Sequence, residues 1–204
     1  MKKILVLEDE SNIRSFVVIN LRRSGYEPIE AENGMMALEK LKVNDEILVE
    51  AYGQGLKIEE CPEITVQSLD PDLLESMNIE VNEQGEMTLP VAAAIPSYLM
   101  GSGLGAGHSY SGDYDLMTAD SEAVKENGLQ NLRFGDIVLI EDSDNTFGRG
   151  YLTGAVSIGV VIHGDCILMG HGPGVSTLLT AKTPVIEGRL DPHANLADLM
   201  GISD

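Results

Sequence analysis

Histidines and aspartates in the second half of the chain are the side chains best suited to chemistry. Three of them lie near apolar runs at positions 163 to 171, and three more lie in the glycine-rich stretch Met100 to Leu116. The six residues are His108, Asp113, Asp115, His163, Asp165 and His171. Imidazole nitrogens and carboxylate oxygens are the ligands that Zn²⁺ and similar divalent ions take in proteins. We therefore predict a metal site, or a site for a small-molecule ligand, built from these residues.

The same groups allow two other interpretations. A histidine beside a carboxylate serves as a general base whose ring is oriented by its partner, and metal-assisted hydrolysis of a small polar substrate is the simplest enzymatic reaction for such a set. In a purely structural or oligomeric protein, every histidine would instead be satisfied by hydrogen bonds within the fold. The sequence has neither a GxSxG elbow nor an HExxH helix to decide between them.

Two apolar, β-branched runs would position these side chains, Ile137 to Ile140 and Val156 to Ile162. Runs of this length, bounded by glycine and polar residues, are typical of buried strands. The loop DSDNTFGRG between them has carboxylates at its first and third positions. Phe147 stands where a calcium-binding EF-hand needs glycine, so we reject that motif. The strand ends therefore predict a polar rim on a sheet.

Shorter patterns predict the elements around these strands. Ile64 to Val66 is a brief strand, and Asp70 followed by proline starts a helix. The apolar stretch Leu89 to Ile95 has prolines beside both ends, which favours an edge strand or an extended loop. Two further helices are expected at Ser121 to Asn127 and Ala194 to Met200.

Composition limits the partners and the compartment. A formal net charge of −20 on 204 residues opposes binding to nucleic acid and to anionic membranes, whereas a homo-oligomer is compatible with it. No apolar run reaches the roughly 18 residues that span a bilayer, and the first strand turns acidic too early for a secretory signal. Cys61 and Cys166 form no CxxC pair, so we expect both to be reduced and structural. These features predict a cytoplasmic protein.

The charge is distributed unevenly along the chain. Residues 1–42 carry seven basic and seven acidic side chains, so the whole net charge of −20 resides in residues 43–204. Glycine follows the same division, since only two of the 22 glycines lie in the first stretch. We therefore predict a boundary near Lys42.

Residues 1–42 have the pattern of a small α/β unit. Ile4 to Leu7 is a buried strand followed by three acidic residues, and an amphipathic helix capped by Ser11 runs to Gly25. Tyr26 to Ala31 is a second strand, and a second helix follows the turn at Asn33. The β-α-β-α order predicts parallel strands joined by a right-handed crossover.

The segment KKILVLEDESNIRSFVVINLRRSGYEPIEAENGMMALEKLK resembles the first half of a response-regulator receiver domain. In that family an acidic pair after the first strand holds Mg²⁺ beside a phosphoacceptor aspartate, and the matching residues here are Glu8 and Asp9. The resemblance implies a phosphorelay signalling module as the alternative function. Glu50 stands where the phosphoacceptor aspartate is expected, and the later receiver strands and helices have no counterpart. The first strand then lacks a partner on one of its two edges, so we predict that residues 46–50 pair beside residues 3–7.

The remainder of the chain resembles a second family. The motifs MGSGLG, GDYDL, LRFGDIVLIED, GVVIHGD and GHGPGVSTLLT are similar to those of a prokaryotic family known as domain of unknown function 4438. That family is β-rich and has no assigned activity, so the resemblance implies a fold class but no catalytic residues. We expect an α+β protein with a partial parallel α/β unit over residues 1–42 and a mainly β domain over residues 43–204.

Overall fold

The structure is a computed structural model that describes residues 2–41, 55–101, 112–165 and 171–202. The chain forms two compact units, Met1–Glu50 and Ala51–Asp204. The boundary predicted near Lys42 falls within residues 42–54, which lie outside the described residues, so its position stays a prediction. In the described ranges, no helix has the length and apolar character needed to cross a membrane.

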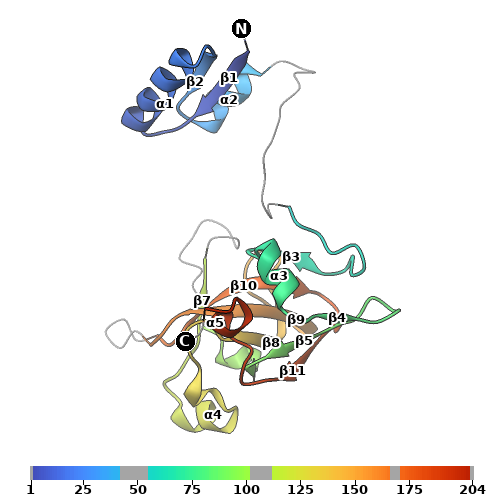
Figure 1. Ribbon diagram of the computed structural model, residues 1–204. Helices are drawn as coiled ribbons and strands as arrows, with labels where there is room; N and C mark the ends of the chain where they lie inside the picture. Colours follow the sequence, from blue (N-terminus) through green and yellow to red (C-terminus); the bar gives the residue numbers. More distant parts are fainter. Residues whose placement is uncertain (1, 42–54, 102–111, 166–170, 203–204) are drawn as a thin grey trace. The chain divides into compact units, whose positions relative to one another are not determined.

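The first unit has the β-α-β-α order that its sequence predicts (Figure 1). Its elements are β1 (Lys3–Leu7), α1 (Ser11–Arg23), β2 (Glu27–Ala31) and α2 (Gly34–Lys40). The two strands are parallel, with Lys3 opposite Glu27. Glu10 rather than Ser11 occupies the N-cap of α1, and Gly25 beyond its end adopts a φ of 85° that glycine tolerates best. The predicted strand at 46–50 lies outside the described residues.

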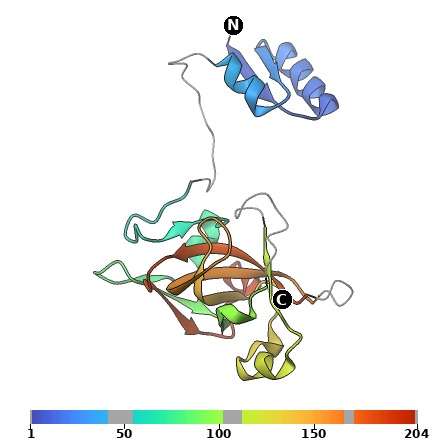
Figure 2. The ribbon, with the colours of Figure 1, turned by 180° about the vertical axis from the view of Figure 1, so that it is seen from behind.

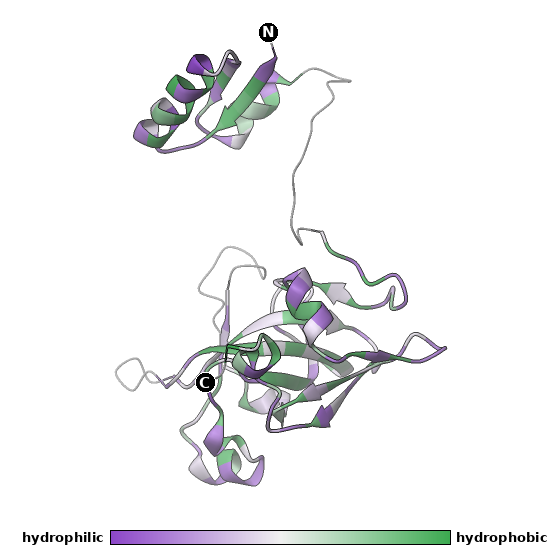
Figure 3. Ribbon diagram, viewed as in Figure 1, coloured by the Kyte–Doolittle hydropathy of each residue, from purple (hydrophilic) through white to green (hydrophobic). Residues whose placement is uncertain are grey.

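The apolar core of the first unit is small. Among its described residues, only Val6, Val18, Ala31 and Ala37 are buried apolar side chains. Figure 3 shows that α1 nevertheless carries apolar residues along its length, and Phe16 is 70% exposed. A two-stranded sheet with so little buried apolar surface contributes little stability by itself.

The second unit is built on a six-stranded sheet. Its strands are β3 (Thr65–Val66), β6 (Ala93–Ile95), β7 (Tyr114–Asp115), β8 (Ile137–Asp144), β9 (Gly150–His163) and β10 (Gly174–Ala181). They follow the order β3-β10-β9-β8-β6, and β7 also pairs with β10. The two long central strands β8 and β9 are antiparallel and contain both predicted apolar runs (Figures 1 and 2).

Both faces of this sheet are buried, which explains why its strands are continuously apolar. Alternate residues of a strand point to opposite faces, so neighbours such as Val160 and Val161 enter different clusters. Val160 packs with Leu89 and Leu179, whereas Val161 packs with Ile95 and Tyr114. The core of the second unit therefore lies on both sides of β9.

A smaller three-stranded sheet has the order β11-β5-β4, with β4 at Glu80–Val81, β5 at Met87–Val91 and β11 at Ile186–Leu190. Only Ala92 separates β5 from β6, so one segment crosses from this sheet to the larger one. The prediction of an edge strand over Leu89 to Ile95 holds for β6, which ends the order of the larger sheet, but was wrong for β5, which is the middle strand of the smaller one and contains the fully buried Leu89. Pro90 is tolerated because β4 pairs only with residues 87 and 88, so no donor is needed from Pro90 on that side.

Short helical segments lie between and after the strands of the second unit. They are α3 (Pro71–Ser76), the 3₁₀ turns η1 (Ser97–Leu99) and η2 (Leu129–Asn131), α4 (Ser121–Glu126) and α5 (Leu196–Leu199). Aspartate or asparagine side chains accept backbone N–H groups at the start of each α-helix, namely Asp70, Asp120 and Asn195. With strands dominating and both parallel and antiparallel pairs present, the protein is a strand-rich α/β mixture.

Candidate metal centre

Three strands meet at the first residue of β10. Gly174 pairs with His163 of β9 on one side and with Asp115 of β7 on the other. Residues paired directly across antiparallel strands point to the same face of the sheet. The side chains of His163 and Asp115 therefore rise on the same face, on either side of a residue that has no side chain.

A bulge in β9 turns His163 towards that face. Val175 pairs with Val161 and the next residue back, Gly174, pairs with His163, so Ile162 is an extra residue in the ladder. In a regular strand without this bulge, His163 and Val161 would lie on the same face, and the side chain of Val161 is buried in the core. The bulge moves the imidazole out of the core and places it next to Asp115.

Gly174 leaves the space in which these side chains meet. A Cβ atom at this position would collide with the ring of His163 and with the carboxylate of Asp113. Asp113 reaches the same space because it lies two residues before Asp115, on the same side of an extended segment. Any other residue at position 174 would occupy the volume that the three side chains share.

The polar atoms of the three side chains are close together. Nε2 of His163 lies 2.8 Å from Oδ2 of Asp113 and 3.3 Å from Oδ1 of Asp115. One ligand atom from each residue lies within 4.8 Å of the other two, which is close enough for all three to hold one metal ion. The side chains are 39%, 27% and 21% exposed for His163, Asp113 and Asp115, so the cluster is open to solvent.

The two ring nitrogens of His163 have different partners. Nδ1 lies 2.8 Å from the carbonyl oxygen of Gly164, which can only accept, so Nδ1 carries a hydrogen. Nε2 lies within hydrogen-bond distance of Oδ2 of Asp113, which also accepts, so both contacts are satisfied together only when each ring nitrogen carries a hydrogen. The hydrogen bond to Gly164 and the charges of Asp113 and Asp115 raise the pKa of His163, although burial opposes the shift. The site therefore favours a positive charge at Nε2, carried by a proton or by a metal ion.

His171 lies beside this cluster. Its Nδ1 is 3.2 Å from Oδ1 of Asp115, and its ring centroid is 6.2 Å from that of His163. Nδ1 of His171 and Oδ1 of Asp115 are both buried, and neither makes a hydrogen bond of acceptable geometry. Asp115 thus lies between His163 and His171.

The structure does not bring the other predicted residues into the group. Asp165 is exposed and lies outside it, and His108 lies outside the described residues. Glu8 and Asp9 follow β1, but among the described residues no third histidine, cysteine or carboxylate completes a ligand set around them. Two features of the site escaped sequence reasoning, the space at Gly174 and the extra residue Ile162. The glycine-rich turn GHGPG indicated the region of the site, but it did not predict that Gly174 leaves space for the neighbouring side chains.

Comparison with known proteins places these motifs in a family. Residues 76–200 match the family described as "Domain of unknown function (DUF4438), C-terminal", and residues 9–75 match its N-terminal part. The second match includes most of the segment that resembles a receiver domain, so these comparisons give the receiver interpretation no support.

One solved structure is similar to this chain. The protein described as "Crystal structure of TM1086" has 43% sequence identity and a TM-score of 0.65 over 81% of this chain. The match spans 58% of the length of that protein. No curated protein matches the chain.

Proposed function

We propose that this chain, which belongs to the DUF4438 family, binds one divalent metal ion through Asp113, Asp115 and His163. The observation that carries the proposal is the orientation of His163. Its Nδ1 is held by the carbonyl of Gly164, and its Nε2 faces two carboxylates. Histidines that bind metals usually donate their other ring N–H to a carbonyl or carboxylate, which fixes the ring and its tautomer.

The spacing of the ligand atoms suits a small divalent ion. In a tetrahedral Zn²⁺ site with bonds near 2.0–2.1 Å, neighbouring ligand atoms lie about 3.3 Å apart. The distance from Nε2 of His163 to the carboxylate of Asp115, 3.3 Å, matches that value, and the 2.8 Å distance to Asp113 is a hydrogen bond that would lengthen when an ion replaces the proton. Small side-chain movements would therefore accommodate the ion.

Charge favours the same conclusion. Two carboxylates beside one imidazole leave the cluster negative even when the ring is protonated, and a divalent cation that replaces the proton at Nε2 neutralises that charge. The net charge of −20 also raises the local concentration of cations around the protein. A mixed nitrogen and oxygen ligand set suits Zn²⁺ and other first-row divalent ions better than the all-oxygen shell that Ca²⁺ prefers.

The reaction class that such a site supports is hydrolysis. Three protein ligands leave a coordination position free, and a bound Zn²⁺ supplies Lewis acidity and a water of lowered pKa. The exposure of the three side chains gives solvent access to that position. The residues of this chain hold the ion and fix the ring of His163.

Calorimetric titration of the metal-free full chain with Zn²⁺ tests the proposal. We expect one ion per chain, and a loss of that binding in His163→Ala and in Asp113→Asn. The matched control is His193→Ala, because the His193 side chain is 81% exposed and its ring pairs with Asp198, which is outside the cluster. Equal Zn²⁺ affinity in the wild type and in both site variants would rule out this centre.

A signalling role for the first unit is the alternative that the sequence raised. It is favoured by the position of Glu8 and Asp9 directly after β1 in a parallel pair of strands. Phosphorelay chemistry also needs a phosphoacceptor aspartate, and position 50 is a glutamate. We therefore propose the metal centre of the second unit, rather than Mg²⁺ binding and phosphorelay at the acidic pair, as the function of this chain.

A further inference from the structure

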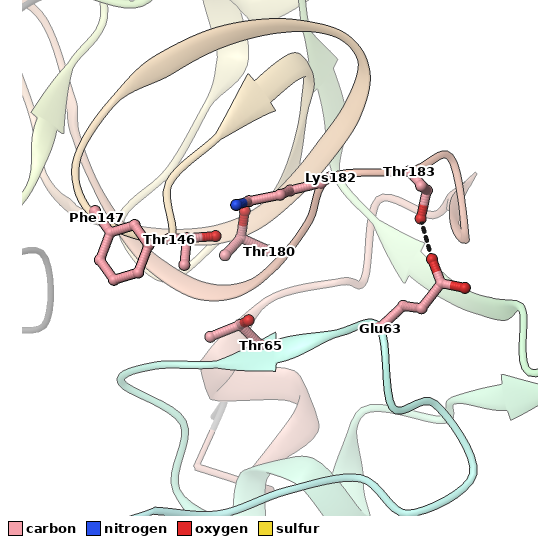
Figure 4. Close-up of a pocket in the computed structure, with 7 residues that line it drawn as sticks. All are labelled: Glu63, Thr65, Thr146, Phe147, Thr180, Lys182 and Thr183. Carbon is pink, nitrogen blue, oxygen red and sulfur yellow. Dashed lines mark hydrogen bonds between the residues drawn. The ribbon is translucent and has the colours of Figure 1, made fainter.

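A separate pocket lies at the far end of β10 from the candidate metal centre. Its volume is about 340 Å³, near the lower end of the range for small-molecule sites. Figure 4 shows the residues that line it, which are Glu63, Thr65, Thr146, Phe147, Thr180, Lys182 and Thr183. They come from β3 and the segment before it, from the β8–β9 loop, and from the end of β10 and the two residues after it. None of them belongs to the candidate metal centre.

Lys182 gives the pocket a positive charge. Its ammonium group lies 5.9 Å from the centroid of the Phe147 ring, a cation–π distance. Figure 4 shows this side chain reaching across the pocket, above Thr180. In the described ranges, no carboxylate lies within ion-pair distance of Lys182, although the chain has 33 acidic residues. The charge is therefore available to a ligand.

Phe147 provides an apolar surface at the rim. Its side chain is 91% exposed, in a chain that has only three phenylalanines. An aromatic ring held in water beside a cation can stack against a flat ligand group at little entropic cost, because the ring has few rotatable bonds. Phe147 and Lys182 thus offer a ring face and a charge next to each other.

The wall that carries Phe147 is fixed by buried hydrogen bonds. The backbone N–H of Asn145 donates to Oγ1 of Thr180 at 3.0 Å, and Nε2 of Gln67 donates to the carbonyl of Asn145 at 2.6 Å. Asn145 and Thr180 are almost completely buried. These bonds anchor the β8–β9 loop to β10 and to the residue after β3, so the pocket is formed before any ligand arrives.

Glu63, the one acidic residue that lines the pocket, is hydrogen-bonded at the end away from Phe147. Oγ1 of Thr183 donates to Oε2 of Glu63 at 2.6 Å, and Figure 4 shows this pair away from Phe147. Thr65 lies opposite Thr180 in the ladder between β3 and β10. The hydroxyl of Thr180 is already hydrogen-bonded to the N–H of Asn145 and to Ser157, so an anion beside Lys182 would meet the hydroxyl of Thr65 rather than the carboxylate of Glu63.

We propose that this pocket binds a small organic anion that carries a flat ring. Its anionic oxygens contact the ammonium of Lys182 and the hydroxyl of Thr65, and its ring stacks on Phe147. Carboxylates and phosphate monoesters share this chemistry. The pocket is independent of the metal centre, so one proposal can fail without the other.

The test is an NMR titration of the full chain, kept metal-free with chelator, with phenyl phosphate and in parallel with inorganic phosphate. We expect phenyl phosphate to shift the amide signals of Thr65, Thr180 and Lys182 and to bind roughly tenfold more tightly than inorganic phosphate, the gain that one aromatic contact provides. Benzoate, which carries a carboxylate on the same ring, should shift the same signals.

Two variants with matched controls separate the contribution of the Lys182 charge from that of the Phe147 ring. Lys182→Ala should weaken both phosphate compounds about tenfold or more, because it removes the charge. Phe147→Ala should reduce phenyl phosphate to the affinity of inorganic phosphate and leave the latter unchanged. Lys125→Ala in α4 and Phe134→Ala, a ring that is 71% exposed outside the pocket, should change neither. All four side chains are exposed or half-buried, so the fold should persist in each variant.

The proposal is overturned by any of three results. The first is the absence of saturable shifts at the lining residues up to tens of millimolar phenyl phosphate. The second is an unchanged affinity in Lys182→Ala. The third is a set of shifts that centre on Asp113 and His163 instead of the pocket.

Discussion

Two of the buried polar atoms that lack a hydrogen bond, Oδ1 of Asp115 and Nδ1 of His171, are the least expected feature of the site at the scale of single residues. Buried polar atoms are almost always paired, and leaving one unpaired is costly. They lie 3.2 Å apart, so a small rotation would let Nδ1–H donate to the carboxylate. His171 would then orient Asp115 for the metal, as the carbonyl of Gly164 orients His163.

This role predicts a graded effect of substitution. His171→Ala should weaken Zn²⁺ binding by about 10- to 100-fold, the usual result of removing a partner of a metal ligand, and should leave the stoichiometry at one. His171→Asn should recover part of the affinity, because its amide N–H can replace Nδ1–H. Calorimetry on the metal-free protein measures both. An unchanged affinity in His171→Ala would remove His171 from the site.

At the scale of elements, the sequence predicted the strands but not their alignment. The apolar runs at 137–140 and 156–162 became the cores of β8 and β9, because only a strand buried on both faces is so continuously apolar. The aspartates and the histidine were visible as ligand types. Their meeting point was not, since it depends on the pairing of Gly174 with two other strands and on the extra residue Ile162. Register between distant segments has no local signature.

The pairing at Gly174 can be tested by filling its space. Gly174→Ala should weaken Zn²⁺ binding at least tenfold and destabilise the fold by about 1–3 kcal/mol, because the added Cβ overlaps the ring of His163 and the carboxylate of Asp113. Gly34→Ala is the matched control, since Gly34 belongs to the first unit and has no part in the metal centre, and a Cβ there meets no atom within 4 Å. Metal titration and urea unfolding give the two readouts. Equal behaviour of the two variants would contradict the packing described for the site.

At the scale of the whole molecule, the chain consists of a small unit with a thin core and a larger unit with a core on both sides of its sheet. Composition indicated this division, because charge and glycine change near residue 42. The identity of the first unit was harder to predict. Its β-α-β-α order is a general solution for packing helices on parallel strands, so a resemblance to a receiver over so short a segment says little about function.

The division into units predicts two thermal unfolding transitions in calorimetry, with the first unit unfolding at the lower temperature. Zn²⁺ should raise only the second, because a ligand stabilises the unit that binds it. At 100 times the dissociation constant the gain is about 2.7 kcal/mol, or roughly 5–10 °C for a unit of this size. Asp113→Asn should abolish the shift while leaving both transitions in place. A shift of the first transition, or of both together, would mean that the metal binds elsewhere or that the units unfold as one.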